Sequence, residues 1–445
     1  MRLNTSYRQI MAISAPIMLG SAAQNVITLS DNVFLYHLSE TDFGAIGFVG
    51  VFYLVIAAIG YGFSRGGQIM IARRMGEGQP YEVGRTFYAM LYYELCLGLV
   101  MYAFMHWGAY AFFDYVLEEQ VILDKSMEYL DYRSWGIFFS YTGVAVIALY
   151  TGVARTSFIV IDTVILATVN IVLDYALIYG HFGLPAMGIG GAGLASSIAE
   201  IVAFVCFFIY ILFDRKNRIY RLFHLPKVDL SLIWQQFKLA FPIVAQAFVG
   251  IGSWFVFFAI IENLGARQLS ISNLGRNVYL ILSIPCWGFA SGINTIVSNF
   301  IGQQKRQAVV PIIWKTAKLC WATTMAVTIP VVFFPHQLLY PLLGSEDMSL
   351  ITESRPVLYV LIPILTFFSI GGVFFNGLAG TGATQFGLMI QVFCALAYLA
   401  YIDIVVNYTS LGLPWAWAAE IFYWIVMLAL TYWYLKSKKW YGLKV

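Results

Sequence analysis

The chain has 445 residues, of which 60% are hydrophobic and only 11% are charged, and its mean hydropathy is +0.76. About a quarter of the residues of a soluble globular protein are charged, so the composition excludes that class and predicts an integral membrane protein. The net charge of +3 is too small to indicate a nucleic-acid partner.

The first apolar segment predicts a spanning helix rather than a cleaved signal. Residues 1–9 are polar, and the apolar run after them extends past Tyr36 while carrying Pro16 and Asp31. A secretory signal has a shorter apolar core and a small-residue cleavage site. We therefore expect this segment to be the first membrane helix of the mature protein.

Twelve segments are long and apolar enough to cross a bilayer, which takes about 20 residues per helix. In chain order they are predicted at 9–37, 43–72, 86–113, 134–154, 158–180, 189–213, 237–261, 269–300, 314–335, 356–378, 386–408 and 414–435. The two sizeable connections, 114–133 and 214–236, leave no room for a soluble domain. The predicted fold class is an all-α integral membrane protein.

The distribution of Lys and Arg predicts how these helices are oriented. With the N-terminus in the cytoplasm, twenty of the 26 Lys and Arg residues lie on the inner side, and Lys125, Arg133, Arg267 and Arg355 lie on the outer side. Cytoplasmic loops of membrane proteins carry an excess of positive charge. We therefore expect both termini in the cytoplasm and a multi-pass protein of the cell inner (plasma) membrane, functional as a monomer within the lipid bilayer.

The two halves of the chain are related by a repeat. A shift of 226 residues places Pro16 on Pro242 and the Gly-Phe-x-x-Gly segment 62–66 on the same pattern at 288–292. Matching glycines and prolines in one register are informative, because each marks a particular backbone requirement.

The repeat predicts two homologous six-helix bundles. The N-terminal lobe is expected at 1–213, a basic cytoplasmic linker at 214–236 and the C-terminal lobe at 237–445. Six helices per half give both halves the same orientation, which is a parallel repeat of the kind found in transporters that move two bundles about a central site.

Ionisable groups inside a bilayer are costly and mark functional sites. Asp31 lies about six residues before the outer end of the first predicted helix, Asp174 about six before the outer end of the fifth, and Ser196 about seven into the sixth. At 1.5 Å per residue these groups share a level roughly 9–11 Å below the outer boundary. Asn170 is four residues before Asp174, so both lie on one helix face.

Such a cluster suits a monovalent coupling ion. Two carboxylates in a partly dry pocket can take up a proton, and four oxygen-bearing side chains can ligate a hard cation such as Na⁺. The alternative is that each group satisfies a helix backbone or reaches outward to water. We expect no cofactor other than this ion.

The repeat argues that this site serves function rather than folding. Later in each half the shift becomes 225, which places Gly152-x-Ala154-x-Thr156 on Gly377-x-Ala379-x-Thr381. The positions equivalent to Asp31, at a shift of 226, and to Asn170 and Asp174, at a shift of 225, are all apolar, namely Phe257, Ala395 and Leu399. Had the acids been needed for folding, both halves should carry them. We therefore expect one ion site, in the first half.

The remaining intramembrane acids are Glu94, Glu200, Asp403 and Glu420, which makes six with Asp31 and Asp174. Glu200 is one turn from Ser196 and is a candidate to extend the acidic pocket. Asp403 and Glu420 are near outer helix ends, so we expect solvated, interfacial positions for both.

The sequence has no signature of an enzyme. It lacks a Gly-Lys-Ser/Thr phosphate loop and a His-Glu-x-x-His motif, and it has no cytoplasmic domain for a nucleotide. Two alternatives to an antiporter stay open. A flippase for lipid-linked saccharides would line its cavity with Arg and Lys, and an intramembrane lipid transferase would cluster acids or histidines near an interface loop.

Several spaced motifs resemble the multidrug and toxic compound extrusion (MATE) family over essentially the whole chain. Pro16, Gln24 and Asp31 follow one another at intervals of eight and seven residues, and Asn170-x-x-x-Asp174 precedes the Gly-Ala-Gly-Leu-Ala-Ser segment at 191–196. Each motif is loose alone, but the order and spacing are specific.

The resemblance implies a secondary antiporter that exports cationic, amphipathic organic compounds in exchange for H⁺ or Na⁺. The residues that match the family's coupling-ion site are Asp31, Asn170, Asp174 and Ser196. Substrates would be small organic cations, and Na⁺, if it is the coupling ion, would bind to these four residues.

Other positions refine this expectation. Gln24 and Glu200 are candidates for the substrate cavity, and Pro16 is expected to act as a conformational element, because proline removes a backbone hydrogen bond and kinks a helix. Where the NorM-like branch of the family carries acids, this chain has Gly250 and Phe368. The chain therefore resembles the DinF-like branch more closely.

Overall fold

The protein is helical throughout the residues that this computed structural model describes, 3–337 and 348–443, apart from short connections. In the described part of the chain, eleven helices are long and apolar enough to cross a membrane, and the number is twelve if α10 (Ala266–Leu282) and α11 (Ile284–Gly302), which meet at a bend of 44°, form one span. The predicted all-α membrane fold is confirmed. Its orientation stays a prediction, and two of the cations counted for it, Arg2 and Lys444, lie outside the described residues.

The first half contains six spans, some of them built from two helical segments. They are α1 (Tyr7–Leu38), α2 (Glu40–Glu77), α3 (Tyr81–Ala103) continuing through a π-turn into α4 (Ala109–Val116), α5 (Gln120–Arg133) continuing through a 3₁₀ turn into α6 (Ile137–Gly152), α7 (Ser157–Tyr179) and α8 (Gly188–Phe213).

The second half repeats this order after the 3₁₀ segment η3 (Arg215–Tyr220). It consists of α9 (Leu230–Glu262), α10 (Ala266–Leu282), α11 (Ile284–Gly302), α12 (Val309–Phe333), α14 (Met348–Thr381), α15 (Thr384–Tyr408), α16 (Leu413–Trp417) and α17 (Ala419–Lys436).

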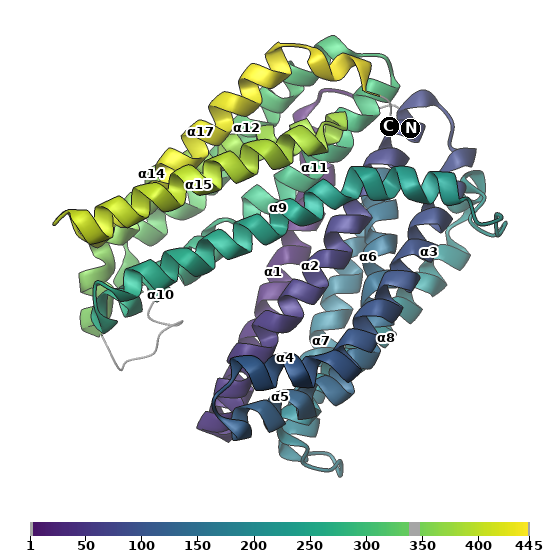
Figure 1. Ribbon diagram of the computed structural model, residues 1–445. Coiled ribbons are helices and arrows are strands. Elements are labelled where there is room, and N and C mark those ends of the chain that lie inside the picture. Colours follow the sequence, from purple (N-terminus) through teal and green to yellow (C-terminus); the bar gives the residue numbers. More distant parts are fainter. Residues whose placement is uncertain (1–2, 338–347, 444–445) are drawn as a thin grey trace. The chain divides into compact units, whose positions relative to one another are not determined.

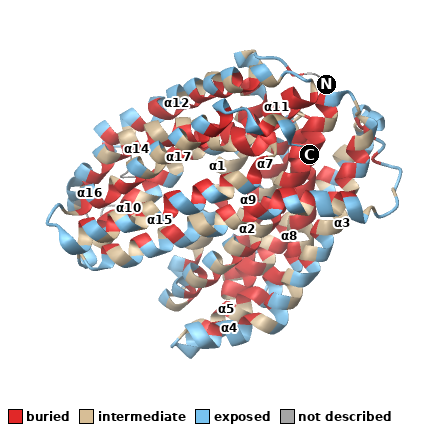
Figure 2. Ribbon diagram, turned by 45° about the horizontal axis from the view of Figure 1, so that its top comes forward, coloured by how far each residue is buried: buried red, intermediate tan, exposed pale blue. Residues whose placement is uncertain are grey.

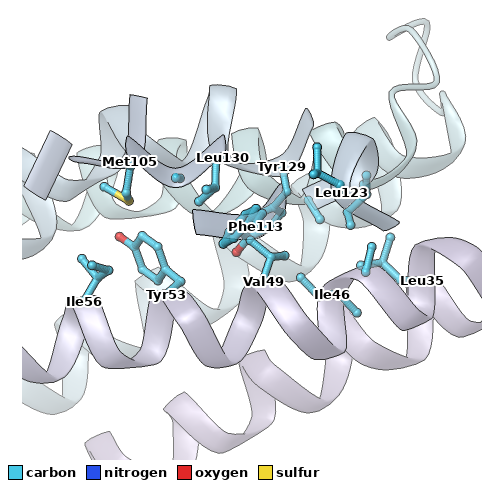
Figure 3. Close-up of a cluster of buried hydrophobic side chains, with 14 of the residues drawn as sticks. Leu35, Ile46, Val49, Tyr53, Ile56, Met105, Phe113, Leu123, Tyr129 and Leu130 are labelled. Atoms are coloured by element: carbon cyan, nitrogen blue, oxygen red, sulfur yellow. The ribbon is translucent and has the colours of Figure 1, made fainter. Parts of the chain in front are cut away.

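The predicted connection at 114–133 is wrong, because most of it is the helix α5. This helix is amphipathic, with many polar residues on one side, so its mean hydropathy is too low to be recognised as part of a span. Leu123, Tyr129 and Leu130 on its other side are buried in a cluster with Tyr53 and Phe113 (Figure 3). Packing of this apolar face therefore extends the fourth span by more than three turns.

Exposed residues follow most of the helices (Figure 2), and many of them are large and apolar. Examples are Phe208, Phe213, Phe255, Phe393 and Leu396, all exposed. A soluble protein rarely exposes apolar patches of this extent, whereas acyl chains of lipid cover them in a membrane. The exposed residues therefore agree with a multi-pass membrane protein.

The chain forms two compact units (Figure 1). The N-terminal unit is Leu19–Phe241, and the C-terminal unit is Met1–Met18 together with Pro242–Val445. The divisions fall inside the continuous helices α1 and α9, beside Pro16 and at Pro242, which are equivalent under the repeat. The lobe boundaries at 213 and 237 stay a prediction.

The linker packs on the N-terminal unit through ion pairs at its two ends. Arg155 pairs with Asp214 at its start, and Arg85 pairs with Asp229 at its end. Asp229 also caps α9 by accepting the backbone N–H of Leu232 at 3.1 Å. This backbone donor, together with the guanidinium of Arg85, lowers the pKa of Asp229.

Candidate functional site

Two glycines allow α8 to lie close to its neighbours. A methyl group added at Gly191 would lie 2.7 Å from the carbonyl oxygen of Leu177 on α7, and one at Gly193 would lie 2.5 Å from that of Tyr129 on α5. No side chain fits at either position, so glycine is required for this approach. Ser196, five residues after Gly191 on α8, also contacts α7, through Asn170.

The four residues predicted to form an ion site lie together in the N-terminal unit. The amide of Asn170 donates to the hydroxyl of Ser196 at 3.2 Å. The carboxyl groups of Asp31, on α1, and Asp174, on α7, lie next to each other. Asn170 and Asp174 are buried, and Asp31 is half-buried.

The site has buried oxygen atoms that no donor satisfies. Both carboxylate oxygens of Asp174, Oδ1 of Asp31 and Oδ1 of Asn170 have no hydrogen-bond partner within the described part of the chain. Buried polar groups are almost always paired, so such atoms need a partner from outside the protein. Since all four are acceptors, a proton, a cation or a donor such as water can bridge them.

A metal at this site would depend on few charged ligands. Among residues 3–337 and 348–443 there is no group of three His, Cys, Asp or Glu side chains that could hold a metal ion. Two carboxylates with an amide and a hydroxyl oxygen form a weakly charged, all-oxygen set. Such a set suits a proton or Na⁺ and is unsuited to a transition metal.

Glu200 does not extend the acidic pocket as a free carboxylate. It forms a two-point ion pair with Arg133, with N–O distances of 2.6 and 2.8 Å. The guanidinium also lies 3.9 Å from the ring centroid of Tyr53. Arg133 was expected on the outer side and is instead buried, because it ends the helix α5 that the sequence analysis took for a connection. The positive charge of Arg133 also attracts the carboxylate of Asp31.

The other predicted residues of α1 lie apart from the acid pair. Gln24 is about two turns before Asp31 and its side chain is exposed, so it contacts neither carboxylate. Pro16 lies inside α1. Between Pro16 and Gln24, α1 runs close to α7, since a methyl group added at Gly20 would lie 3.3 Å from the hydroxyl of Thr163.

Two buried acids were missed or misplaced by the sequence analysis. Asp162, in the first part of α7, is 5% exposed and was not counted among the intramembrane acids, although it falls inside the predicted span 158–180. Glu420 was expected at a solvated interface but is only 4% exposed. Although Glu420 lies in the first turn of α17, side chains from other helices, among them Tyr398 and Trp254, cover it.

The sequence of the chain matches the MatE family model over residues 16–176 and 242–409, one segment in each half. The chain therefore belongs to the MATE family, whose members are transporters and not enzymes.

Relatives and solved structures agree with this assignment. The chain is 25% identical over 443 residues to the "Probable multidrug resistance protein NorM" of Thermotoga maritima, covering 97% of this chain and 93% of the relative. It has the same fold as an outward-facing "multidrug resistance MATE family transporter", with a TM-score of 0.89 at 18% identity and coverage of 97% and 95%. A "MATE in the bent conformation" gives a TM-score of 0.85 at 19% identity, with coverage of 97% and 96%. The NorM name of the relative does not favour the expected DinF-like branch.

Proposed function

We propose that this MATE-family transporter is a secondary antiporter of the inner membrane, which exports small cationic, amphipathic organic compounds in exchange for H⁺ or Na⁺. The observation that carries the proposal is the pairing of Asp31 with Asp174 beside Asn170 and Ser196, in a buried site whose oxygen atoms lack donors. The multidrug-resistance name of the similar protein supports the choice of substrate class.

The acid pair can couple the two movements through its charge. Two adjacent carboxylates in a dry site cannot both stay ionised without a large energetic cost. When a proton or Na⁺ binds, the negative charge of Asp31 and Asp174 is reduced and a cationic substrate is held less tightly. When the ion leaves, the charge and the attraction return. By linkage, each cation lowers the affinity for the other, which is the requirement for exchange.

The proposal also includes a conformational role for Pro16 and a closer relation to the DinF-like branch of the MATE family. A solved structure of this fold carries the description "bent conformation", which supports a conformational role for Pro16 in the continuous helix α1. Gly250 and Phe368 supply no carboxylate where the NorM-like branch has acids, and this favours ion coupling of the DinF-like kind, confined to the first half.

Dye uptake into everted membrane vesicles tests the proposal. Ethidium is offered under an imposed proton gradient, under an imposed Na⁺ gradient and with neither. We expect accumulation with one gradient and none without. A saccharide-lipid flippase would move no ethidium under any condition, and a transferase would respond to no gradient, so either result would overturn the proposal.

A further inference from the structure

Glu420 is a buried carboxylate with only neutral partners. It lies in the first turn of α17 in the C-terminal unit. The side chains of Tyr398, Trp254 and Trp424 lie next to its carboxyl group. No Lys, Arg or His among the described residues forms an ion pair with it. It differs in this from Glu200, whose charge is balanced by Arg133.

The repeat places Glu420 at the counterpart of the first-half ion site. A shift of 225 residues brings it onto Ala195, next to Ser196. The helices α9, α15 and α17 then correspond to α1, α7 and α8, which carry the first site. The second half has therefore lost the acids of two helices and gained one on the third.

The surroundings of Glu420 are tightly packed aromatic rings. Phe257, which replaces Asp31 in the repeat, lies 5.4 Å from Trp417 and 6.1 Å from Tyr398 between ring centroids. Trp254 lies 5.4 Å from Tyr279. Phe257 and Trp417 are both fully buried.

The chemistry of this environment selects a proton. An unpaired carboxylate inside a membrane protein is expensive, so a positive partner is required. A hard metal ion takes about six or more oxygen ligands, whereas the side chains near Glu420 offer only the hydroxyl groups of Tyr398, Tyr279 and Tyr423. A proton needs only the carboxylate itself.

We propose that Glu420 is a second proton-binding site, in the C-terminal unit, which titrates independently of Asp31 and Asp174. Release breaks the carboxyl O–H bond, leaves the electron pair on the carboxylate and sends the proton to water. The neighbouring side chains of Trp254 and Tyr398 each carry an N–H or O–H donor, which then stabilises the anion. This site goes beyond the proposed function, which needs only the first-half acid pair.

Infrared difference spectroscopy of the purified, full-length protein in lipid tests this inference directly. Spectra recorded across a pH titration report the C=O stretch of protonated buried carboxyl groups. In the variant that combines Asp31→Asn with Asp174→Asn, we expect a titrating carboxyl band to remain. Adding Glu420→Gln should remove the component of that band that belongs to Glu420, whereas adding Glu94→Gln, at another buried glutamate, should leave this component unchanged. The assay requires no transport, so failure of the proposed antiport would not affect it.

Spectra that are identical with and without Glu420→Gln would overturn the inference, because Glu420 would then be permanently ionised or permanently neutral. If Glu420→Gln does not fold, Glu420→Asp provides the same test. It keeps a carboxyl group at a changed distance from Tyr398, so both the frequency of the band and its titration midpoint should shift. An unchanged band in that variant would also overturn the inference.

Discussion

Two arginine–glutamate ion pairs have similar N–O distances but differ in burial. Comparing them shows how burial changes the contribution of an ion pair to stability. Arg133 and Glu200 are joined at 2.6 and 2.8 Å, with side chains 8% and 15% exposed. Arg267 and Glu353 are joined at 2.8 and 3.0 Å, with side chains 42% and 46% exposed.

Removing the glutamate should therefore lower the free energy of unfolding more for the buried pair than for the exposed pair. Glu200→Gln leaves a buried guanidinium without its counter-charge, and we expect a loss of about 3–5 kcal/mol in the free energy of unfolding. Glu353→Gln opens an exposed pair and should cost about 0–1 kcal/mol. Denaturant unfolding of both variants in detergent provides the comparison. Equal losses would show that burial does not control the strength of the first pair.

A carboxylate should not be tolerated at the position that replaces Asp31 in the second half. Phe257→Asp removes a buried ring from the aromatic cluster and adds a charge close to Glu420. We expect a loss of more than about 3–5 kcal/mol, the usual cost of truncating a buried Phe, together with poor expression. Phe257→Leu keeps the site apolar and should be far milder. A well-expressed Phe257→Asp protein with altered ion stoichiometry would contradict this expectation.

At the scale of helices, the approach of α8 to α7 depends on Gly191. Gly191→Ala would force the α8 backbone away from the carbonyl of Leu177, and we expect this to cost about 1–3 kcal/mol and to weaken export, since Ser196 moves with the helix. Gly143→Ala, on α6, is the matched control, because a methyl group there meets nothing within 4 Å. Thermal unfolding and drug-resistance assays should separate the two variants; equal behaviour would argue against the close-contact explanation.

The sequence was sufficient to place the membrane-spanning helices, because a spanning helix is defined by apolar length alone. It was insufficient for α5, where burial of one face compensates for a polar other face. Sequence patterns are limited in the same way for single side chains. Shared depth and helix periodicity predicted that Asp31, Asn170, Asp174 and Ser196 are neighbours, and the structure places them near one another, while their role as an ion site stays a prediction. The pairing of Glu200 with Arg133 and the burial of Glu420 depend on helix ends and rotations, which periodicity does not determine.

At the scale of the whole molecule, the boundaries between the two compact units fall inside the helices α1 and α9. These helices carry the equivalent prolines Pro16 and Pro242. A proline leaves one backbone carbonyl of its helix without a donor and allows bending at low cost.

We expect Pro16→Ala to slow export at least several-fold while binding of the coupling ion stays unchanged, because bending is impaired and the acid pair is about four turns away. Initial export rates and ion binding to the purified protein are the two measurements. If the kink is static, export will keep its rate and only stability will change.

The central claim is that ion coupling passes through Asp31 and Asp174. The most direct measurement is substrate accumulation in proteoliposomes driven by an imposed H⁺ or Na⁺ gradient, comparing wild type with Asp31→Asn and Asp174→Asn. We predict that each variant loses gradient-driven accumulation while unfolding at the same or a higher temperature, since removing a buried unpaired charge relieves its desolvation cost. Asp403→Asn, at a half-buried acid of α15 in the other unit, should keep transport. Accumulation at the wild-type level by folded Asp174→Asn would contradict the account.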